Sequence, residues 1–257
     1  MPRIPRNRAS IYYEVHGDGP AVVFAHGAEG NTLSWFQQVP FFSKRFRVVI
    51  FDHRGFGRSE CHPDAVHTSY FADDLRAVLD AEGIGRAALV GHSIGGWPCL
   101  RTAIDYPDRV SCLVLAATTG GLITPSLLQR MAESAVRMAR GEEVWRQMIS
   151  ETVARRDPAL AFLFEQIYLL NPPLDPGRVS EVTEVRVHPE ELTGFSVPTL
   201  VLLPELDAWQ RRDLLREAVG AIPGVKTVDL EDVGVAAHFE APHLFNKLVS
   251  DFVAQHV

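Results

Sequence analysis

Short, continuous apolar runs recur along the chain, and each ends in a polar or glycine-containing stretch. The runs occupy residues 10–15, 21–25, 46–51, 87–90, 112–116, 198–203 and 225–230. Runs of this length without alternation indicate strands that are buried on both faces, as in a mainly parallel sheet. Segments with helical spacing of apolar residues lie between them, at residues 71–79, 214–219 and 245–252. The alternation of strand and helix predicts an α/β fold with helices on both faces of the sheet.

The interval from residue 120 to residue 195 breaks this rhythm, because it contains no such run and its apolar residues recur at helical spacing. One predicted helix begins at Asp157-Pro158, a capping residue followed by proline at the first helical position, and ends before Asn171. Ligands of parallel α/β sheets bind outside the carboxyl ends of the strands. We therefore predict a core formed by residues 1–119 and 196–257, and a helical cap formed by residues 120–195 that covers the strand ends.

Composition and charge narrow the classes of function. Hydrophobic residues make up 46% and charged residues 22% of the chain, and the net charge of −7 disfavours nucleic acid as a partner, because phosphate binding needs a positive field. There is no run of about 18 apolar residues that would span a membrane, and the basic start is not followed by the apolar stretch of a secretory signal. The three cysteines are widely spaced, which indicates free thiols. We expect a cytoplasmic protein that acts on a small molecule; the sequence carries no signal for an oligomeric state.

A cluster of glycines surrounds one serine directly after the run at residues 87–90. Residues 91–95 read GHSIG and lead into a helical segment, which is the G-x-S-x-G pattern of a nucleophile elbow. Such a turn forces Ser93 into a strained conformation, while Gly91 and Gly95 leave room where side chains would collide. Gly96 would let the helix pack close to the sheet. The alternative is a glycine turn with an ordinary capping serine, which the preceding strand disfavours.

A serine hydroxyl is a weak nucleophile and needs a base within hydrogen-bonding reach. His238 follows the last predicted strand, so it lies at the same edge of the sheet as Ser93. His243 is the alternative, although its position after Ala-Pro predicts the first turn of the terminal helix. The side chain of His92 is expected to turn away from the site. We expect the other histidines either to hold loops (His26 and His53) or to face solvent.

Four motifs together resemble the α/β-hydrolases of the lidded, single-domain type, and the resemblance covers nearly the whole chain. They are the His-Gly-Ala of residues 26–28, the DHRGFGRS of residues 52–59, the elbow, and the AAHFEAP of residues 236–242. The resemblance implies a mostly parallel, eight-stranded sheet with a helical cap inserted between strands 6 and 7. It also implies a catalytic triad in the chain order serine, acid, histidine.

The resemblance places the acid of the triad, which orients the histidine, just after the run at residues 198–203, at Asp207. Pro204 stands where these enzymes usually have glycine, so Glu205 is the alternative acid. Some relatives carry the acid after the sixth strand, but residues 118–121 contain no carboxylate. The resemblance also implies an oxyanion hole formed by the backbone N–H groups of Ala28 and Ile94.

Methionine and aromatic residues of the predicted cap would form adaptable apolar walls around a substrate. These residues are Met131, Met138, Trp145, Met148, Phe162, Phe164 and Tyr168. The alternative is that they pack the cap onto the core. The sequence has no metal-binding motif and no glycine loop with nucleotide-binding spacing, so we expect neither a metal nor another cofactor.

These residues support three hypotheses about function. The first is hydrolysis of a carboxylic ester or lactone of a small, mainly apolar substrate through an acyl-enzyme on Ser93, as in a carboxylesterase or lactonase. The second uses the same triad for C–C bond hydrolysis of a diketone-type substrate, or for cofactor-free oxygenase or lyase chemistry, because the fold does not determine the reaction. The third is a non-catalytic ligand-binding protein, which would not need all three groups of the triad.

Overall fold

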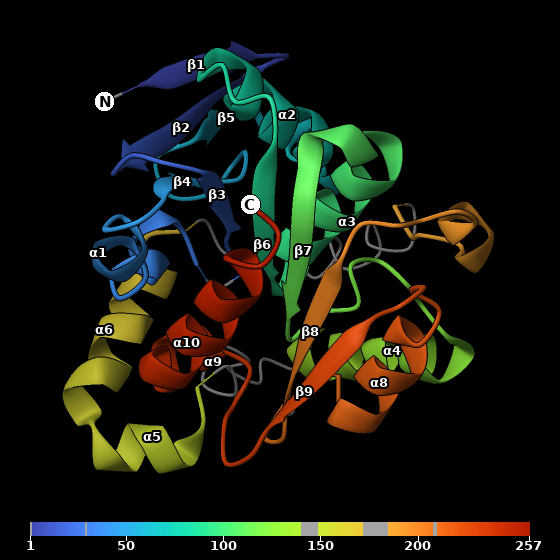
Figure 1. Ribbon diagram of the computed structural model, residues 1–257. Helices are drawn as coiled ribbons and strands as arrows, with labels where there is room; N and C mark the ends of the chain where they lie inside the picture. Colours follow the sequence, from blue (N-terminus) through green and yellow to red (C-terminus); the bar gives the residue numbers. More distant parts are fainter. Residues whose placement is uncertain (1, 29, 140–148, 172–184, 208–209) are drawn as a thin grey trace.

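The computed structural model describes residues 2–28, 30–139, 149–171, 185–207 and 210–257, with the backbone alone for residues 135 and 137–139. In this part of the chain nine strands form one twisted sheet (Figure 1). Its order is β1-β2-β4-β3-β6-β7-β8-β9, and β5 pairs with β2. The strands are β1 (Arg3–Arg6), β2 (Ala9–His16), β3 (Ala21–Ala25), β4 (Arg47–Phe51), β5 (Glu60–Cys61), β6 (Ala87–His92), β7 (Val110–Ala116), β8 (Thr199–Pro204) and β9 (Lys226–Leu230).

The six strands from β4 to β9 in the sheet order run parallel, and only the pairings of β2 with β1, β4 and β5 are antiparallel. This confirms the predicted α/β fold with a mostly parallel sheet. The central strands are buried along their whole length, as their continuous apolar runs require. The described sheet has one strand more than expected, because the two-residue β5 pairs beside β2.

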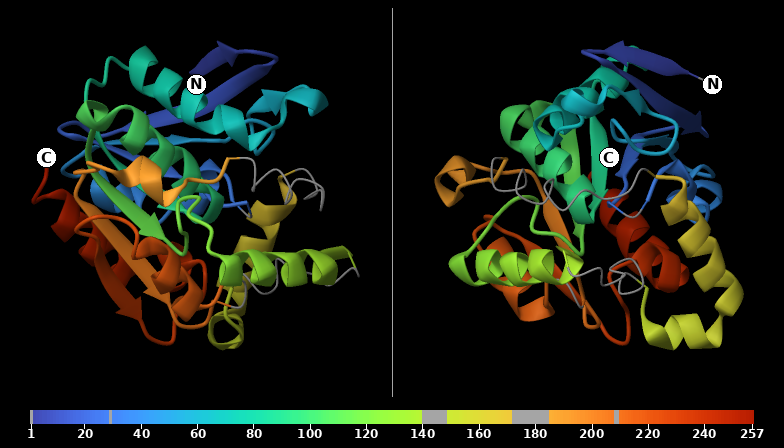
Figure 2. Two further views of the ribbon diagram at one scale, coloured as in Figure 1. Left: turned by 90° about the vertical axis from the view of Figure 1, so that its right-hand side faces the viewer. Right: turned by 180° about the vertical axis from the view of Figure 1, so that it is seen from behind.

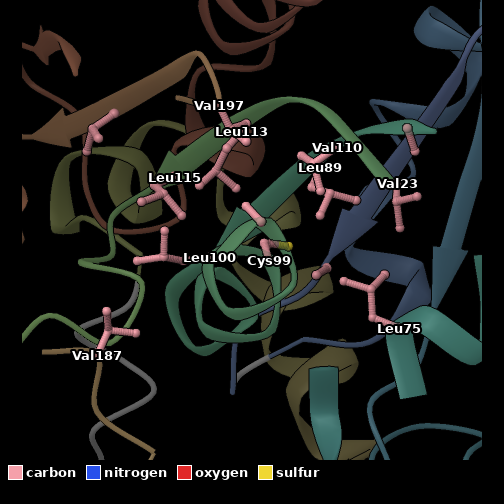
Figure 3. Close-up of a cluster of buried hydrophobic side chains, with 14 of the residues drawn as sticks. Val23, Leu75, Leu89, Cys99, Leu100, Val110, Leu113, Leu115, Val187 and Val197 are labelled. Carbon is pink, nitrogen blue, oxygen red and sulfur yellow. The ribbon is translucent and has the colours of Figure 1, made fainter. Parts of the chain in front are cut away.

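Helices cover both faces of the sheet, and each face has its own hydrophobic core (Figure 2). On one face α2 (Phe71–Ala81), α3 (Gly96–Asp105) and α8 (Arg212–Val219) pack against the strands. Figure 3 shows Cys99 and Leu100 of α3 among valines and leucines of the strands. On the other face α1 (Val39–Phe42) and α10 (Pro242–Val253) pack around Phe24, Phe42 and Phe245.

The segment between β7 and β8 contains helices, as predicted. They are α4 (Pro125–Ala139), α5 (Glu151–Arg156) and α6 (Pro158–Leu169). Asp157 caps α6 by accepting the N–H of Leu160 at 3.0 Å, and Pro158 occupies the first helical position, which confirms the predicted start of this helix. Because β5 enters the numbering, the segment lies between the seventh and eighth strands rather than the sixth and seventh.

The inserted helices lie against two different parts of the molecule. α4 contacts α8, whereas α5 and α6 lie beside α10 and α9 (Ala237–Glu240) (Figure 1). Ile149, Val153, Phe164 and Ile167 from this second group form a buried cluster with Ala236 and Phe239. The α5–α6 pair therefore packs directly onto the chain segment that carries His238.

Among the helices of the described residues, none combines the length and the apolar character needed to cross a membrane.

Candidate active site

Ser93 lies at the sharp turn between β6 and α3, in the left-handed region of backbone space with φ of 49°. A non-glycine residue in this region is strained, and such residues cluster at functional sites. The glycines around it are required by close contacts. A Cβ on Gly91 would lie 2.5 Å from Cα of Gly96, and one on Gly95 would lie 2.6 Å from the carbonyl oxygen of His26. The sharp strand-to-helix turn predicted around Ser93 is present, and the role of Ser93 as a nucleophile stays a prediction.

His238 is 2% exposed and is held by aromatic rings and by its own backbone. The ring centroids of Trp35 and His92 each lie 4.6 Å from that of His238, and the ring of Phe245 lies at 5.9 Å. The carbonyl oxygen of His238 accepts a hydrogen bond from Nε2 of Gln38 at 2.9 Å. The imidazole thus has a defined place in the fold, next to the residue that precedes Ser93.

Burial lowers the pKa of His238 well below its ordinary value near 6.5, and the neighbouring His92 and His26 lower it further. Desolvation has this effect because a low-dielectric environment penalises the charged imidazolium. The side chain is therefore neutral at neutral pH. A neutral imidazole can accept a proton, as a general base must.

His92, the residue before Ser93, contacts the chain segment that leads to His238. Its side chain is fully buried and its Nε2 donates to the carbonyl oxygen of Val235 at 2.9 Å. Its ring packs against that of His238. That contact does not place the ring relative to Ser93, so the expectation that His92 turns away from the site stays a prediction. The end of β6 lies beside the loop between β9 and α9, and His92 links the two.

Asp207 is 5% exposed in the loop after β8, and its Oδ1 accepts the backbone N–H of Gln210 at 2.9 Å. The N–H of Leu206 donates to the carbonyl of Val233 at 2.9 Å, so this loop runs beside the one that leads to His238. Nδ1 of His238, however, is buried without a hydrogen-bond partner among the described residues. The structure brings the two loops together but does not form the Asp207–His238 hydrogen bond, and the acid assignment stays a prediction.

The alternative residues of the sequence analysis lie on the surface. The side chain of Glu205 is 43% exposed, accepts the N–H of Asp232 at 3.0 Å and lies 3.6 Å from Arg212. It is engaged in solvent-facing contacts and not with the buried imidazole. His243 is exposed in the first turn of α10, as predicted. Of the two candidate acids, Asp207 is buried and Glu205 is exposed. Of the two candidate bases, His238 is buried and His243 is exposed.

The predicted oxyanion residues follow two neighbouring parallel strands, because Ala25 of β3 pairs with Gly91 of β6. Ala28 and Ile94 are both half-buried just beyond these strand ends. The loop of Ala28 is held by His26, whose Nδ1 donates to the carbonyl of Gly27 at 2.7 Å and whose Nε2 accepts the N–H of His53 at 2.9 Å. This confirms that His26 holds a loop; the oxyanion role of Ala28 and Ile94 remains a prediction.

The polar residues after β4 form a rigid support. Asp52 is fully buried and accepts the backbone N–H groups of Thr32 at 2.6 Å and Arg58 at 2.7 Å. Arg54 forms a two-pronged ion pair with Asp74 of α2, with both bonds at 2.6 Å and both side chains 1% exposed. These charges are satisfied within the fold, so they support the neighbouring loops.

The residues predicted to line a substrate site differ in how deeply they are buried. Phe162 is 62% exposed on α6, so it is not part of the buried packing of that helix, and its assignment as a wall residue stays a prediction. Met131 is partly buried and packs against the core that contains α3 and α8, Phe164 packs against Phe239 at 5.2 Å, and Tyr168 is half-buried. The predictions for Trp145, Met148 and the side chain of Met138 lie outside the described residues.

Two functional candidates were not found from the sequence. Trp35 is fully buried against His238, and Glu240 is a buried carboxylate two positions after that histidine. The sequence pattern that could have pointed to Trp35 is the capping box Asn31–Ser34, which orders the short helix that ends at this residue. No local sequence pattern pointed to Glu240, because its hydrogen-bond partner Ser150 lies ninety positions away in the chain.

In the part of the chain that the structure describes, no group of three or more histidine, cysteine or acidic side chains could hold a metal ion.

The chain is similar in sequence to several named hydrolases. Proteins from Caulobacter and from Azorhizobium caulinodans, provisionally named carbamate hydrolase RutD, match the chain. The protein from Caulobacter strain K31 is 41% identical over 111 residues, which is 41% of each chain, and the Azorhizobium protein is 25% identical over 99% of each.

Two solved structures share the fold over nearly the whole chain. Est816, described as an N-acyl homoserine lactone degrading enzyme, is 28% identical with a TM-score of 0.80 and covers 98% of this chain and 100% of its own. A thermophilic esterase from Thermogutta terrifontis is 26% identical with a TM-score of 0.82, over 97% and 95% of the two chains. A family model for the alpha/beta hydrolase fold matches residues 20–242. The chain therefore belongs to the α/β hydrolase fold family.

Proposed function

We propose that the protein hydrolyses a carboxylic ester or lactone of a small, mainly apolar molecule through an acyl-enzyme on Ser93. The observation that carries this proposal is the strained backbone of Ser93, with φ of 49°, at a turn where Gly95 packs against Ala25 of β3 and Gly91 packs against Gly96. Strain of this kind persists only where the surrounding structure enforces it. Here it holds the half-buried Ser93 just before α3, directly after the buried His92.

In the proposed reaction, Oγ of Ser93 attacks the carbonyl carbon and His238 accepts the hydroxyl proton. The oxyanion receives hydrogen bonds from the N–H groups of Ala28 and Ile94. His238 then returns the proton to the leaving alkoxide, which departs as an alcohol and leaves the acyl-enzyme. A water molecule, deprotonated by His238, cleaves the acyl-enzyme to a carboxylic acid and restores Ser93. For a lactone, acid and alcohol are released as one hydroxy acid. Asp207 would accept the Nδ1 hydrogen of His238 during these steps.

Three relatives support an activated carbonyl as the reacting group. Est816 is described as degrading a lactone, the Thermogutta protein is named an esterase, and the name RutD refers to carbamate hydrolysis. Each of these bonds joins a carbonyl carbon to a heteroatom that leaves after attack. An ester or lactone is the bond named for both solved structures, which are 28% and 26% identical to this chain. The Azorhizobium protein covers the chain equally well at 25% identity, so a carbamate is included in the second experiment.

The first experiment tests Ser93 as the nucleophile. The purified chain is treated with a fluorophosphonate probe and, separately, mixed with p-nitrophenyl butyrate in a stopped-flow instrument. We expect one probe per chain on the peptide that contains Ser93, and a burst of nitrophenol equal to the enzyme concentration. The Ser93→Ala variant should lose both signals, whereas Ser69→Ala, a change at an exposed serine, should keep both. Labelling of both variants alike would refute the proposal.

A second experiment separates the bond types. Acid release is followed at constant pH with a short acyl ester, an N-acyl homoserine lactone and a phenyl carbamate, under matched conditions. The proposal expects the highest kcat/KM for the ester or the lactone, and loss of that activity in Ser93→Ala. Turnover of a vinylogous diketone in place of all three would favour C–C bond hydrolysis instead.

A further inference from the structure

Glu240 is a buried carboxylate that the proposed reaction does not use. It is 5% exposed at the end of α9, the short helix that also contains His238. Its Oε1 accepts the backbone N–H of Ser150 at 2.8 Å, and its Oε2 accepts the hydroxyl of Ser150 at 2.7 Å and the N–H of Gly234 at 3.1 Å. Three donors thus converge on two oxygens, so both oxygens have hydrogen-bond partners although the side chain is buried.

Ser150 connects this carboxylate to the inserted helices. It is the N-cap of α5, and its Oγ accepts the N–H of Val153 at 3.3 Å while its own hydrogen goes to Glu240. The residue is buried, with 7% exposure. The first turn of α5 is therefore fixed by Glu240 both through the backbone and through the cap.

Gly234 connects the same carboxylate to the loop before His238. A Cβ at this position would collide with the carboxylate of Glu240, so the glycine leaves the space that Glu240 fills. The next residue, Val235, accepts the hydrogen bond from His92. Glu240 thus joins three segments: the start of α5, the loop between β9 and α9, and the helix of His238.

From these contacts we propose that Glu240 is a positioning residue, which sets the place of the His238 imidazole by clamping its loop to the start of α5. The proposal rests on the proposed function, because His238 is the base of that reaction. The apolar contacts point the same way, since Phe239 of α9 packs in one cluster with Val153 and Phe164 of the inserted helices. The segment of His238 and the α5–α6 pair are then held together as one rigid group.

A glutamine at position 240 cannot replace the carboxylate. If its oxygen takes the place of Oε1, its NH₂ group faces the N–H of Gly234, and two donors oppose each other. If its oxygen takes the place of Oε2, its NH₂ group faces the N–H of Ser150 instead. Either orientation leaves a buried donor without an acceptor, which loosens the clamp while the volume of the side chain is kept.

The test compares Glu240→Gln with the matched surface variant Glu217→Gln, and Ser150→Ala with Ser150→Thr. Steady-state kinetics with p-nitrophenyl butyrate are measured at a temperature where circular dichroism shows each variant folded. We expect Glu240→Gln to lower kcat at least tenfold with less than a threefold change in KM, and the acid limb of its pH–rate profile to move towards pH 6.5. Ser150→Ala should show part of this loss, Ser150→Thr should restore it, and Glu217→Gln should match the wild type.

A readout without substrate separates this inference from the proposed function. Diethyl pyrocarbonate acylates neutral imidazoles, and mass spectrometry reports the rate at His238 relative to the exposed His62. We expect slow modification of His238 in the wild type and at least a fivefold higher rate in Glu240→Gln. Unchanged modification and an unchanged pH profile, with only a lower Tm, would overturn the inference. Absence of any hydrolysis by the wild type would instead refute the proposed function, while the modification rates would still decide the role of Glu240.

Discussion

The indole ring of Trp35 lies against the imidazole of His238, with 4.6 Å between the ring centroids and 39° between the ring planes. Trp35 is fully buried and also packs against Phe24 at 5.0 Å and Phe245 at 6.4 Å. The Trp35 ring therefore belongs to the hydrophobic core around Phe24 and Phe245 and also contacts the His238 ring. The orientation of the His238 ring depends on this packing, whereas the hydrogen bond from Gln38 holds only its backbone carbonyl.

Replacing Trp35 with alanine should destabilise the protein and impair the reaction. Removal of a fully buried tryptophan leaves a cavity and costs about 3–5 kcal/mol, and here the cavity borders His238. We expect a fall of that size in the free energy of unfolding in urea and a lower kcat in the remaining folded protein. Trp35→Phe should lose less in both measurements. Phe36→Ala, at a neighbouring side chain that is 40% exposed, serves as the control and should change stability by less than Trp35→Ala.

Stability should fall as the pH drops below 6.5. The pKa values of His53 and His238 both lie well below their ordinary value in the folded protein, mainly because of burial. The unfolded chain then binds protons that the folded chain does not, so each histidine stabilises the fold above pH 6.5 and this stabilisation is lost as the pH falls towards the folded pKa. Each contributes a slope of up to about 1.4 kcal/mol per pH unit.

Urea unfolding at pH 7.5, 6.5, 5.5 and 5.0 measures this dependence. The difference between the wild type and His238→Gln isolates one histidine, because the carboxylates contribute equally to both proteins. We expect a shallower pH dependence in the variant. Parallel curves for the two proteins over this range would contradict a depressed pKa of His238.

The glycine at position 95 should be more sensitive than a glycine in open space. A Cβ there would approach the carbonyl oxygens of Ala25 and His26, both of them backbone atoms that cannot move aside. We expect Gly95→Ala to displace the turn, to lower stability by about 1–3 kcal/mol as overpacking does, and to slow labelling of Ser93 by a fluorophosphonate. Gly85→Ala is the matched control, because nothing lies within 4 Å of its added Cβ. Equal labelling rates in the two variants would show that the packing of Gly95 does not set the position of Ser93.

The acid of the triad can be assigned by a paired substitution. Asp207→Asn should lower kcat strongly, by about 10⁴-fold if it follows the serine protease example, since the amide cannot stabilise the imidazolium. Glu205→Gln should leave kcat near that of the wild type, because the side chain of Glu205 is exposed beside Arg212. Initial rates with p-nitrophenyl butyrate measure both. A larger loss in Glu205→Gln would reverse the assignment.

The strands could be predicted from the sequence because their burial on both faces leaves an uninterrupted apolar run. β3 has the predicted bounds, and β6 extends two residues further, to His92. β1 was missed, since its sequence RIPR at the sheet edge contains two arginines and a proline and has no apolar run. Edge strands bury little surface, so hydrophobicity does not mark them.

The site was predictable where a local pattern determines the geometry, and not where distant segments meet. Ser93 sits in a turn that its own neighbours enforce, so five residues were enough to find it. The contact between His92 and His238 depends on how the loop after β9 returns to the end of β6, which no local pattern encodes. The exposure of Phe162 could not be predicted for the same reason, because helical spacing alone does not tell which side of α6 faces the core.

The hydrogen bonds between Glu240 and Ser150 have a consequence for protein engineering and for the divergence of related proteins. A chimera that receives the residues between β7 and β8 from another family member would import new substrate contacts together with a new partner for Glu240. If Glu240 positions His238 as proposed, only grafts with a serine or threonine at the position of Ser150 would keep the His238 side chain in place. Exchange of specificity through this segment is thus restricted at a single position that touches no substrate in the proposed mechanism.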